Sequence, residues 1–428
     1  MNGIKSVELC RGVNLRFIGT DKFKTNRISF YIHLPLNRET VTAAALLPRV
    51  LKRGTEKYPT MSDISKRAEE LYGAAVGSGI GKSGDVQLVR FNIEFVNDKF
   101  ISESIEKDVI ELLKQLVLCP KTENGAFCAE YVKQEKENAK SAILGLINDK
   151  KEYASVRCNE IMFEGDPYGI FEYGSVEDLE KIDEKNLYEF YRTLIETAAI
   201  DIIVSGAFDE GKIIGEVKSV FGECLSGRTA AAETTAIAKI EENISVKRVT
   251  EPMAVTQSKL CMGFNCGTDP LSDEYYGLRL FCCVFGGSPF SKLFNNVREK
   301  LSLAYYVFSA VERRKGCMKI SAGIEADKFD AAYDEITVQL EKMKSGDFTD
   351  DEIVSAKKYM ATGMNSVKDS LAATESFYME QILLGADETP DSVLEKINAV
   401  TRDDIRAAAN KVQTDTVYFL KGAAADEV

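Results

Sequence analysis

GGSPFSKLFNNVREKLSLAYYVFSA, from Gly286 to Ala310, is the stretch that contributes most to the interpretation of this 428-residue chain. Its pattern predicts a glycine turn, a short amphipathic helix and a strand. Arg298 and Tyr305 flank the predicted helix end, where a guanidinium and a phenol can converge on one carbonyl oxygen. Such a pair can orient a peptide and stabilise a developing oxyanion. Both residue types are also ordinary in helices and strands, so spacing alone does not decide their role.

The composition is that of a soluble globular protein, with 45% apolar and 28% charged residues. The length favours two large domains or three smaller ones. A net charge of -13 would repel nucleic-acid phosphates and anionic lipid headgroups, so neither nucleic acid nor membrane is expected as a partner. Because the chain shows no secretion signal and no long apolar run, we expect a cytoplasmic location.

Cysteine and histidine usage argues against a metal site. The ten cysteines are scattered through apolar runs without a CxxC pair, which is typical of buried thiols. Histidine occurs once, as His33 at the end of a predicted strand, and we expect it to be a hydrogen-bonded structural residue. Any mechanism that needs two histidines is therefore excluded for this chain alone.

The second half of the chain repeats the order of the first. FNIEFVNDKF, ending at Phe100, recurs as SAGIEADKF, ending at Phe329, and LEKI at 179–182 recurs at 394–397. Repeats this long indicate a duplicated domain. Strands and long helices mix without regular alternation, which predicts an α+β fold of two homologous domains, each a mostly antiparallel sheet packed with long helices. We expect domains at 1–225 and 246–428, joined by a linker at 226–245.

Three local patterns have simple structural interpretations. GIGKSG at 79–84 leads into a strand, which favours a hairpin turn over a phosphate loop. The glycine pair at 286–287 favours a tight strand-to-helix turn over an anion cradle. VTAAALLPRVLKRGT predicts a buried helix that Pro48 interrupts.

Taken together, the motifs resemble those of the insulinase/pitrilysin metallopeptidases, which include the mitochondrial processing peptidases. REKLSLAYYVFS resembles the family's signature, which lies outside the zinc domain, and NRETVTAAALLPRVLKRGTEKYP resembles its zinc helix. DPYGIFEYGSVEDLEKI is similar to the family's later loop and helix, and AVTRDDIRAAANKV is similar to its closing helix. The resemblance covers nearly the whole chain and implies two α+β domains that enclose half of a clamshell chamber. It also implies that Arg298 and Tyr305 reach the substrate at a zinc site.

The zinc motif itself is missing. Active members of the family carry HxxEH, in which two histidines bind zinc and the glutamate activates water. The equivalent positions here are Ala45, Pro48 and Arg49, and the position of the third ligand, a glutamate in the family, is Ala142. None of these side chains can do that chemistry, so we expect no metal or other cofactor in this chain, and zinc only in a partner chain.

The leading hypothesis is a non-catalytic subunit of a two-chain zinc endopeptidase. A homologous HxxEH chain would supply the zinc, while this chain would supply Arg298 and Tyr305, complete the chamber and help to select unfolded peptides. By itself the chain would not be a peptidase. The alternative is a scaffold or peptide-holding homodimer in which Arg298 and Tyr305 only pack. A third hypothesis is a self-sufficient peptidase with atypical metal ligands.

Overall fold

The computed structural model describes residues 4–229 and 245–423, which form two compact units. The described part of the first unit comprises 4–144, 170–229 and 368–389, and that of the second comprises 145–169, 245–367 and 390–423. Most of the predicted linker, 230–244, lies outside the described residues. The units differ from the contiguous division 1–225 and 246–428 because each contains a segment from the other half of the chain.

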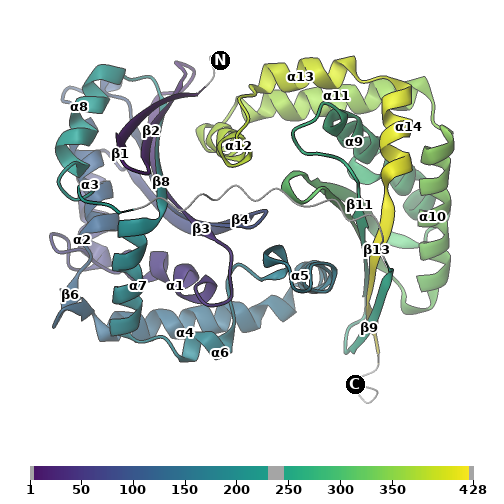
Figure 1. The fold of residues 1–428 in the computed structure, drawn as a ribbon, viewed down its shortest axis with the longest axis horizontal. Coiled ribbons are helices and arrows are strands. Elements are labelled where there is room, and N and C mark those ends of the chain that lie inside the picture. Colours follow the sequence, from purple (N-terminus) through teal and green to yellow (C-terminus); the bar gives the residue numbers. More distant parts are fainter. Residues whose placement is uncertain (1–3, 230–244, 424–428) are drawn as a thin grey trace. The chain divides into compact units, whose positions relative to one another are not determined.

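The first unit is built on a six-stranded sheet in the order β1-β2-β8-β3-β5-β4 (Figure 1). Among these described strands, neighbours are antiparallel except for β2 and β8, which are parallel. The strands are β1 (Lys5–Cys10), β2 (Val13–Gly19), β3 (Thr25–Pro35), β4 (Ala75–Ser83), β5 (Val86–Val96) and β8 (Ala199–Gly206), with a separate small pair, β6 (Thr122–Glu123) and β7 (Ala126–Phe127). The predicted GIGKSG hairpin is confirmed, since 79–83 end β4 and Gly84 begins the turn into β5.

The helices of this unit come from the N-terminal half of the chain, except for α12, which comes from the C-terminal half. They are α1 (Val41–Leu51), α2 (Met61–Glu70), α3 (Glu106–Leu118), α4 (Ala129–Gly145), α6 (Val176–Glu180), α7 (Glu184–Thr197), α8 (Glu210–Phe221) and α12 (Leu371–Leu384). Ile28, Phe30 and Ile32 of β3 join the main core formed with α1, α3, α7 and α8. Because strand side chains alternate between faces, the polar residues between them point to the opposite face of the sheet, where α12 packs.

The second unit repeats this pairing scheme in a sheet of order β11-β12-β10-β13-β9. Its strands are β9 (Lys247–Met253), β10 (Ser258–Asn265), β11 (Ala304–Glu312), β12 (Cys317–Ile324) and β13 (Gln413–Gly422). Within this described sheet β13 and β9 are the parallel pair, as β2 and β8 are in the first sheet. The α+β class and the two homologous domains predicted from the sequence are thereby confirmed.

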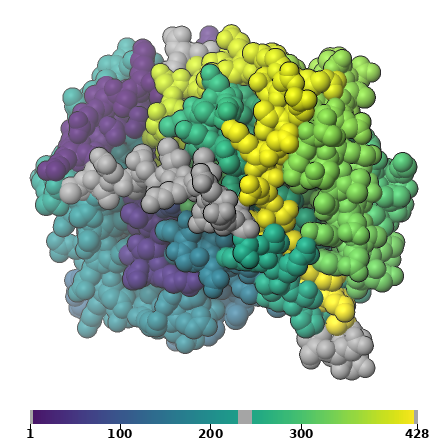
Figure 2. Space-filling view, turned by 45° about the vertical axis from the view of Figure 1, so that its right-hand side comes forward, coloured from purple at the N-terminus to yellow at the C-terminus, as the bar shows by residue number. Residues whose placement is uncertain are grey.

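The helices of the second unit follow the same plan. They are α5 (Lys150–Met162), α9 (Glu274–Cys282), α10 (Phe329–Ser345), α11 (Asp350–Val367), α13 (Pro390–Ala399) and α14 (Arg402–Lys411), with two π-helices, η4 (Cys283–Gly287) and η5 (Phe294–Lys300). Helices α10 and α14 pack side by side at the surface, as the light-green and yellow regions of Figure 2 show.

Two helices are exchanged between the halves of the chain. Helix α5, from the N-terminal half, packs on β10 and β13 of the second sheet, and α12, from the C-terminal half, packs on β3 and β8 of the first. Each is the helix that covers the sheet face opposite the main helical layer of its unit. No local pattern in the sequence predicts this exchange.

Two local predictions were wrong. Pro48 does not interrupt its helix, because α1 runs through it from Val41 to Leu51 and buries nine of its eleven residues. A proline inside a helix costs about 3 kcal/mol, whereas each fully buried large apolar side chain contributes about 1.5–3 kcal/mol, so burial prevails. Gly286 and Gly287 do not join a strand to a helix, since they end η4 and lead to η5.

Within the residues that the structure describes, no helix is both long enough and apolar enough to cross a membrane.

Candidate functional site

The backbone that carries Arg298 is an unusually wide helical turn. Arg298 lies in the π-helix η5, and the Leu301 amide closes this helix by donating to the Asn296 carbonyl. Ser302 follows in a left-handed conformation with φ 50°, which non-glycine residues seldom adopt. Short π-helical segments and strained backbone concentrate at functional sites, so this geometry marks the segment as a candidate.

The backbone that carries Tyr305 is irregular as well. Ala304 lies opposite Ile324 and Tyr306 lies opposite Gly323, so Tyr305 is one extra residue inserted into β11, a β-bulge. A bulge redirects the side chain at its position and interrupts the strand's regular alternation. Tyr305 is 57% exposed, although residues on either side of it are partly or fully buried. The bulge therefore presents the phenol to solvent.

Arg298 has an accessible guanidinium. Its Nε lies 3.6 Å from the Glu299 carboxylate, and its guanidinium carbon lies 4.7 Å from the centroid of the Phe294 ring. Because both partners are on the same exposed helix, the pair resembles other surface ion pairs, which contribute about 0–1 kcal/mol. The guanidinium is held over the ring but keeps donors free for a ligand.

The Tyr305 hydroxyl donates a hydrogen bond of 3.0 Å to Oε1 of Glu325. This bond is the main reason that the pKa of Tyr305 is raised, so the phenol stays protonated at neutral pH and keeps its donor proton. Lys328 and Tyr305 in turn lower the pKa of Glu325. Glu325 falls within the repeated SAGIEADKF segment, but the repeat alone provides no reason to connect it with Tyr305.

Arg298 and Tyr305 are on neighbouring elements, since η5 packs against β11. Among the described residues no hydrogen bond or ion pair joins the two side chains to each other. Because the Arg298 guanidinium and the Tyr305 hydroxyl do not bond to each other, both can donate hydrogen bonds to a third group. The predicted convergence on one substrate oxygen remains a proposal.

Gly286 allows η4 to pack closely on β11. A Cβ atom there would lie 2.8 Å from both the Leu293 side chain and the Ser309 hydroxyl. The glycine therefore serves the close packing of η4 on β11, and not the strand-to-helix turn predicted for it.

The four positions that the resemblance equates with zinc ligands do not form a metal site. Ala45 and Pro48 are buried in α1, Arg49 is half-buried on the same helix, and Ala142 is exposed on α4. Methyl, pyrrolidine and guanidinium groups provide no oxygen, sulfur or imidazole ligand for zinc. In the parts of the chain that the structure describes, no cluster of three or more His, Cys, Asp or Glu residues could hold a metal. The donor set needed for zinc chemistry is not present in these residues.

His33 has a structural partner. It is buried on β3, and its Nε2 lies 2.9 Å from Oδ2 of Asp201 on β8, while Asp201 also accepts from Arg16 at 2.5 Å. Burial raises the pKa of Asp201, but His33 and Arg16 outweigh it and lower the pKa overall. The carboxylate is therefore fully charged at neutral pH, which fits the structural role predicted for His33.

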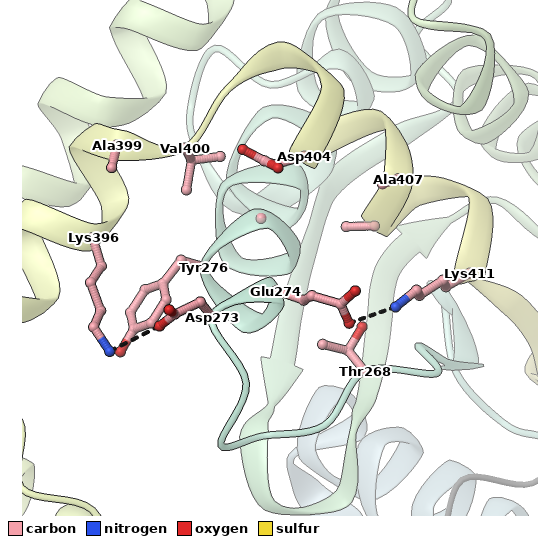
Figure 3. Close-up of a pocket in the computed structure, with 12 residues that line it drawn as sticks. Thr268, Asp273, Glu274, Tyr276, Lys396, Ala399, Val400, Asp404, Ala407 and Lys411 are labelled. Atoms are coloured by element: carbon pink, nitrogen blue, oxygen red, sulfur yellow. Dashed lines mark hydrogen bonds and ion pairs between the residues drawn. The ribbon is translucent and has the colours of Figure 1, made fainter.

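A separate pocket of about 340 Å³ opens between the start of α9 and the helices α13 and α14 (Figure 3). Its rim charges pair with one another, Glu274 with Lys411 at 2.6 Å and Asp273 with Lys396 at 3.0 Å. Asp404 caps its own helix by accepting from the Thr401 amide. Each of these charged groups therefore has a partner within the protein, and the pocket gives no reason to expect a charged ligand there.

Comparisons with known proteins agree on one family. A protein-family model described as "Peptidase M16 inactive domain" matches residues 181–360. The probable inactive metalloprotease YmfF of Bacillus subtilis strain 168 is 33% identical over 419 residues, which is 96% of each chain. The uncharacterized zinc protease YmxG of the same organism is 26% identical over 248 residues, covering 56% of this chain and 58% of that protein. The crystal structure of a conserved protein from Enterococcus faecalis V583 matches 99% of each chain with a TM-score of 0.91 at 28% identity.

The duplicated α+β fold and the match to the inactive-domain model define a metallopeptidase-like protein. The chain belongs to the M16 peptidase family, as a member that lacks the HxxEH motif.

Proposed function

We propose that this chain is the non-catalytic subunit of a two-chain zinc metalloendopeptidase. A homologous chain supplies HxxEH and zinc, and this chain supplies Arg298 and Tyr305 to the carbonyl of an unfolded peptide and completes the chamber. One observation carries the proposal: the Arg/Tyr pair is exposed on two backbone irregularities, whereas every zinc-ligand position has lost its chemistry. Packing residues need neither exposure nor an irregular backbone.

The comparisons support the existence of such a partner. One organism carries both a probable inactive metalloprotease and an uncharacterized zinc protease that are similar to this chain. A chain of the second kind is the partner that the proposal requires.

In the assembled pair, the residues of this chain act on the substrate carbonyl. The Arg298 guanidinium fixes the peptide through two donors, and the Tyr305 hydroxyl donates to the oxygen as negative charge develops on it. Zinc, when bound to the partner, supplies the activated water. Tyr305 must exchange Glu325 for the substrate, and the exposure of their hydrogen bond makes that exchange easy.

The test is to mix the purified chain with the HxxEH homologue from the same genome and to follow cleavage of a quenched fluorescent peptide. Tyr305→Phe and Arg298→Ala should each lower kcat by about 10²–10³, which is the effect of removing one oxyanion donor. Tyr359→Phe and Arg192→Ala are matched controls on exposed helix positions and should leave kcat unchanged.

Full turnover by both site variants would disprove the proposed role of Arg298 and Tyr305. A chain that binds the peptide but activates no HxxEH partner would support the alternative, a peptide-holding scaffold or homodimer. Stoichiometric zinc and peptide hydrolysis by the chain alone would instead support a self-sufficient peptidase.

A further inference from the structure

The face of the second sheet beneath α5 carries an unusual group of cations. One face of β10 points toward α5 and carries Lys259, Cys261 and Gly263. Cys261 packs with Cys158 of α5, and Gly263 closely approaches Met162. Lys259 is only 6% exposed, and its ammonium donates to the neutral side-chain oxygen of Gln257. Burying an ammonium costs free energy unless a negative charge compensates it.

A second ammonium lies over the same aromatic ring. The Nζ of Lys259 is 5.7 Å from the centroid of the Tyr306 ring, and the Nζ of Lys151 is 5.3 Å from the same centroid. Lys151 also lies 4.5 Å from the centroid of the Phe308 ring. Within the described residues, neither ammonium has a carboxylate at ion-pair distance, which is notable in a chain with a net charge of -13.

Asp149 is the carboxylate that acts on Lys259, and it does so only through space. Burial lowers the pKa of Lys259 and Asp149 opposes that shift. The Oδ1 atom of Asp149 accepts hydrogen bonds from the amides of Lys151 and Glu152, so this carboxylate caps the start of α5. The two ammonium groups and Asp149 together leave one net positive charge.

The Tyr306 hydroxyl adds a third donor. It is buried and makes no hydrogen bond of normal geometry among the described residues. Burial raises the pKa of Tyr306 to about 12, against a smaller opposing effect of the Ser321 side chain, so the hydroxyl keeps its proton. A buried polar group without a partner costs about 1–3 kcal/mol, and a ligand that supplies an acceptor would recover it. Two ammonium groups thus lie near the Tyr306 ring, and the Tyr306 hydroxyl has no acceptor among the described residues.

We propose that Lys151, Lys259 and Tyr306 bind the terminal carboxylate of a peptide. One carboxylate supplies acceptors for all three donors and cancels the single net charge, whereas a phosphate dianion would overcompensate it. The exposed Phe308 ring on the same strand provides an apolar surface for the last side chain of the peptide. The site adjoins Tyr305 along β11, and in this respect it rests on the proposed function, because the anchored peptide is the same substrate.

The experiment measures binding of one labelled peptide to the isolated chain by fluorescence anisotropy, as the free acid and as the C-terminal amide. The free acid should bind about tenfold more tightly, as expected for a charge-assisted hydrogen bond. Lys259→Met and Tyr306→Phe should each reduce that preference. Lys151→Gln, on an exposed side chain, should do the same without a risk to folding. Lys300→Gln changes the net charge equally at an exposed site and should preserve the preference.

Equal binding of acid and amide would overturn the proposal, as would a preference that survives Lys151→Gln and Lys259→Met. If an amidated peptide with an internal Asp binds as tightly as the free acid, the site does not distinguish a terminal carboxylate from a side-chain carboxylate. Inorganic phosphate that displaces the label while acetate does not would assign the cluster to phosphate instead. The assay contains neither zinc nor a partner, so a failed peptidase test would leave its result intact.

Discussion

At the scale of single residues, the polar face of β3 is held by two buried charge clusters. Glu375 of α12 accepts hydrogen bonds from Ser29 at 2.8 Å and from Tyr31 at 2.6 Å, and it lies 3.3 Å from the Arg27 guanidinium. Farther along β3, His33 is paired with Asp201. Apolar periodicity predicts which residues of β3 face the main core, but these charges find their partners only in the folded chain.

Glu375→Ala should destabilise the protein by about 3 kcal/mol, because it leaves the buried Arg27 with only the Glu94 carboxylate, 3.7 Å away. Glu380→Ala on the same helix is the matched control. Its carboxylate is half-exposed and accepts from Ser83 at 2.7 Å, so its loss should cost about 1 kcal/mol. Urea unfolding of both variants measures the difference, and equal losses would contradict the buried cluster.

Asp201 should make the protein sensitive to acid. Its folded pKa is lower than the ordinary value of 3.8, so the unfolded chain binds a proton first as pH falls. The stabilisation that the charged Asp201 provides is therefore complete above the unfolded pKa of about 3.8, and it is lost as the pH drops through the folded pKa. Asp201→Asn should therefore flatten the dependence of unfolding free energy on pH below about pH 4. Urea titrations at several pH values test this, and an unchanged slope would contradict it.

At the scale of elements, the docking of α5 depends on the absence of a side chain in β10. A Cβ atom at Gly263 would lie 2.5 Å from the Met162 sulfur, so the helix and the strand are in close contact there. Gly79 in β4 is a comparable strand glycine, where an added methyl group would have nothing within 4 Å. The two positions separate the effect of the contact from that of replacing glycine in a strand.

Gly263→Ala should destabilise the protein by about 1–3 kcal/mol and speed hydrogen exchange of the α5 amides, because overpacking displaces the helix. Gly79→Ala should leave α5 exchange unchanged. Exchange mass spectrometry on both variants provides the measurement. If α5 stays as protected in Gly263→Ala as in the wild type, then Met162 moves aside at little cost and the contact does not control docking.

Most elements could be predicted from local patterns, because periodicity and capping act over short distances. The β4–β5 hairpin and the repeated strand-helix passages are examples. The π-helix around Arg298 and the bulge at Tyr305 could not be predicted, since both are one-residue departures that depend on packing against β11 and β12 respectively. The partners of Glu375 could not be predicted either, because Arg27, Ser29 and Tyr31 are more than 340 residues away in the sequence.

At the scale of the whole molecule, the exchange of α5 and α12 couples folding of the two halves of the chain. Residues 1–229 lack the helix that covers the polar face of their sheet, and residues 245–428 lack α5. Expressed separately, the two fragments should be unstable, because buried groups such as Arg27 and Tyr31 would lose Glu375. Co-expressed, they should copurify as one complex.

Affinity purification through a tag on either fragment tests this prediction. Glu375→Ala in the C-terminal fragment should lower recovery of the N-terminal one, whereas Glu380→Ala should not. Independent folding of both fragments, with native circular dichroism and no association, would contradict the coupling.

The bulge at Tyr305 and the wide turn at Arg298 also bear on how this site can be lost. Each is, in effect, an added residue in an otherwise regular element, and a base substitution changes a side chain without removing a residue. Substitution of Arg298 and Tyr305 would leave the irregular backbone in place, and only a deletion would restore the regular spacing. Suppose that a relative keeps the number of residues from Phe294 to Tyr306 but lacks the Arg298 and Tyr305 side chains. In such a relative, the length of this segment would still indicate that an ancestor had the pair.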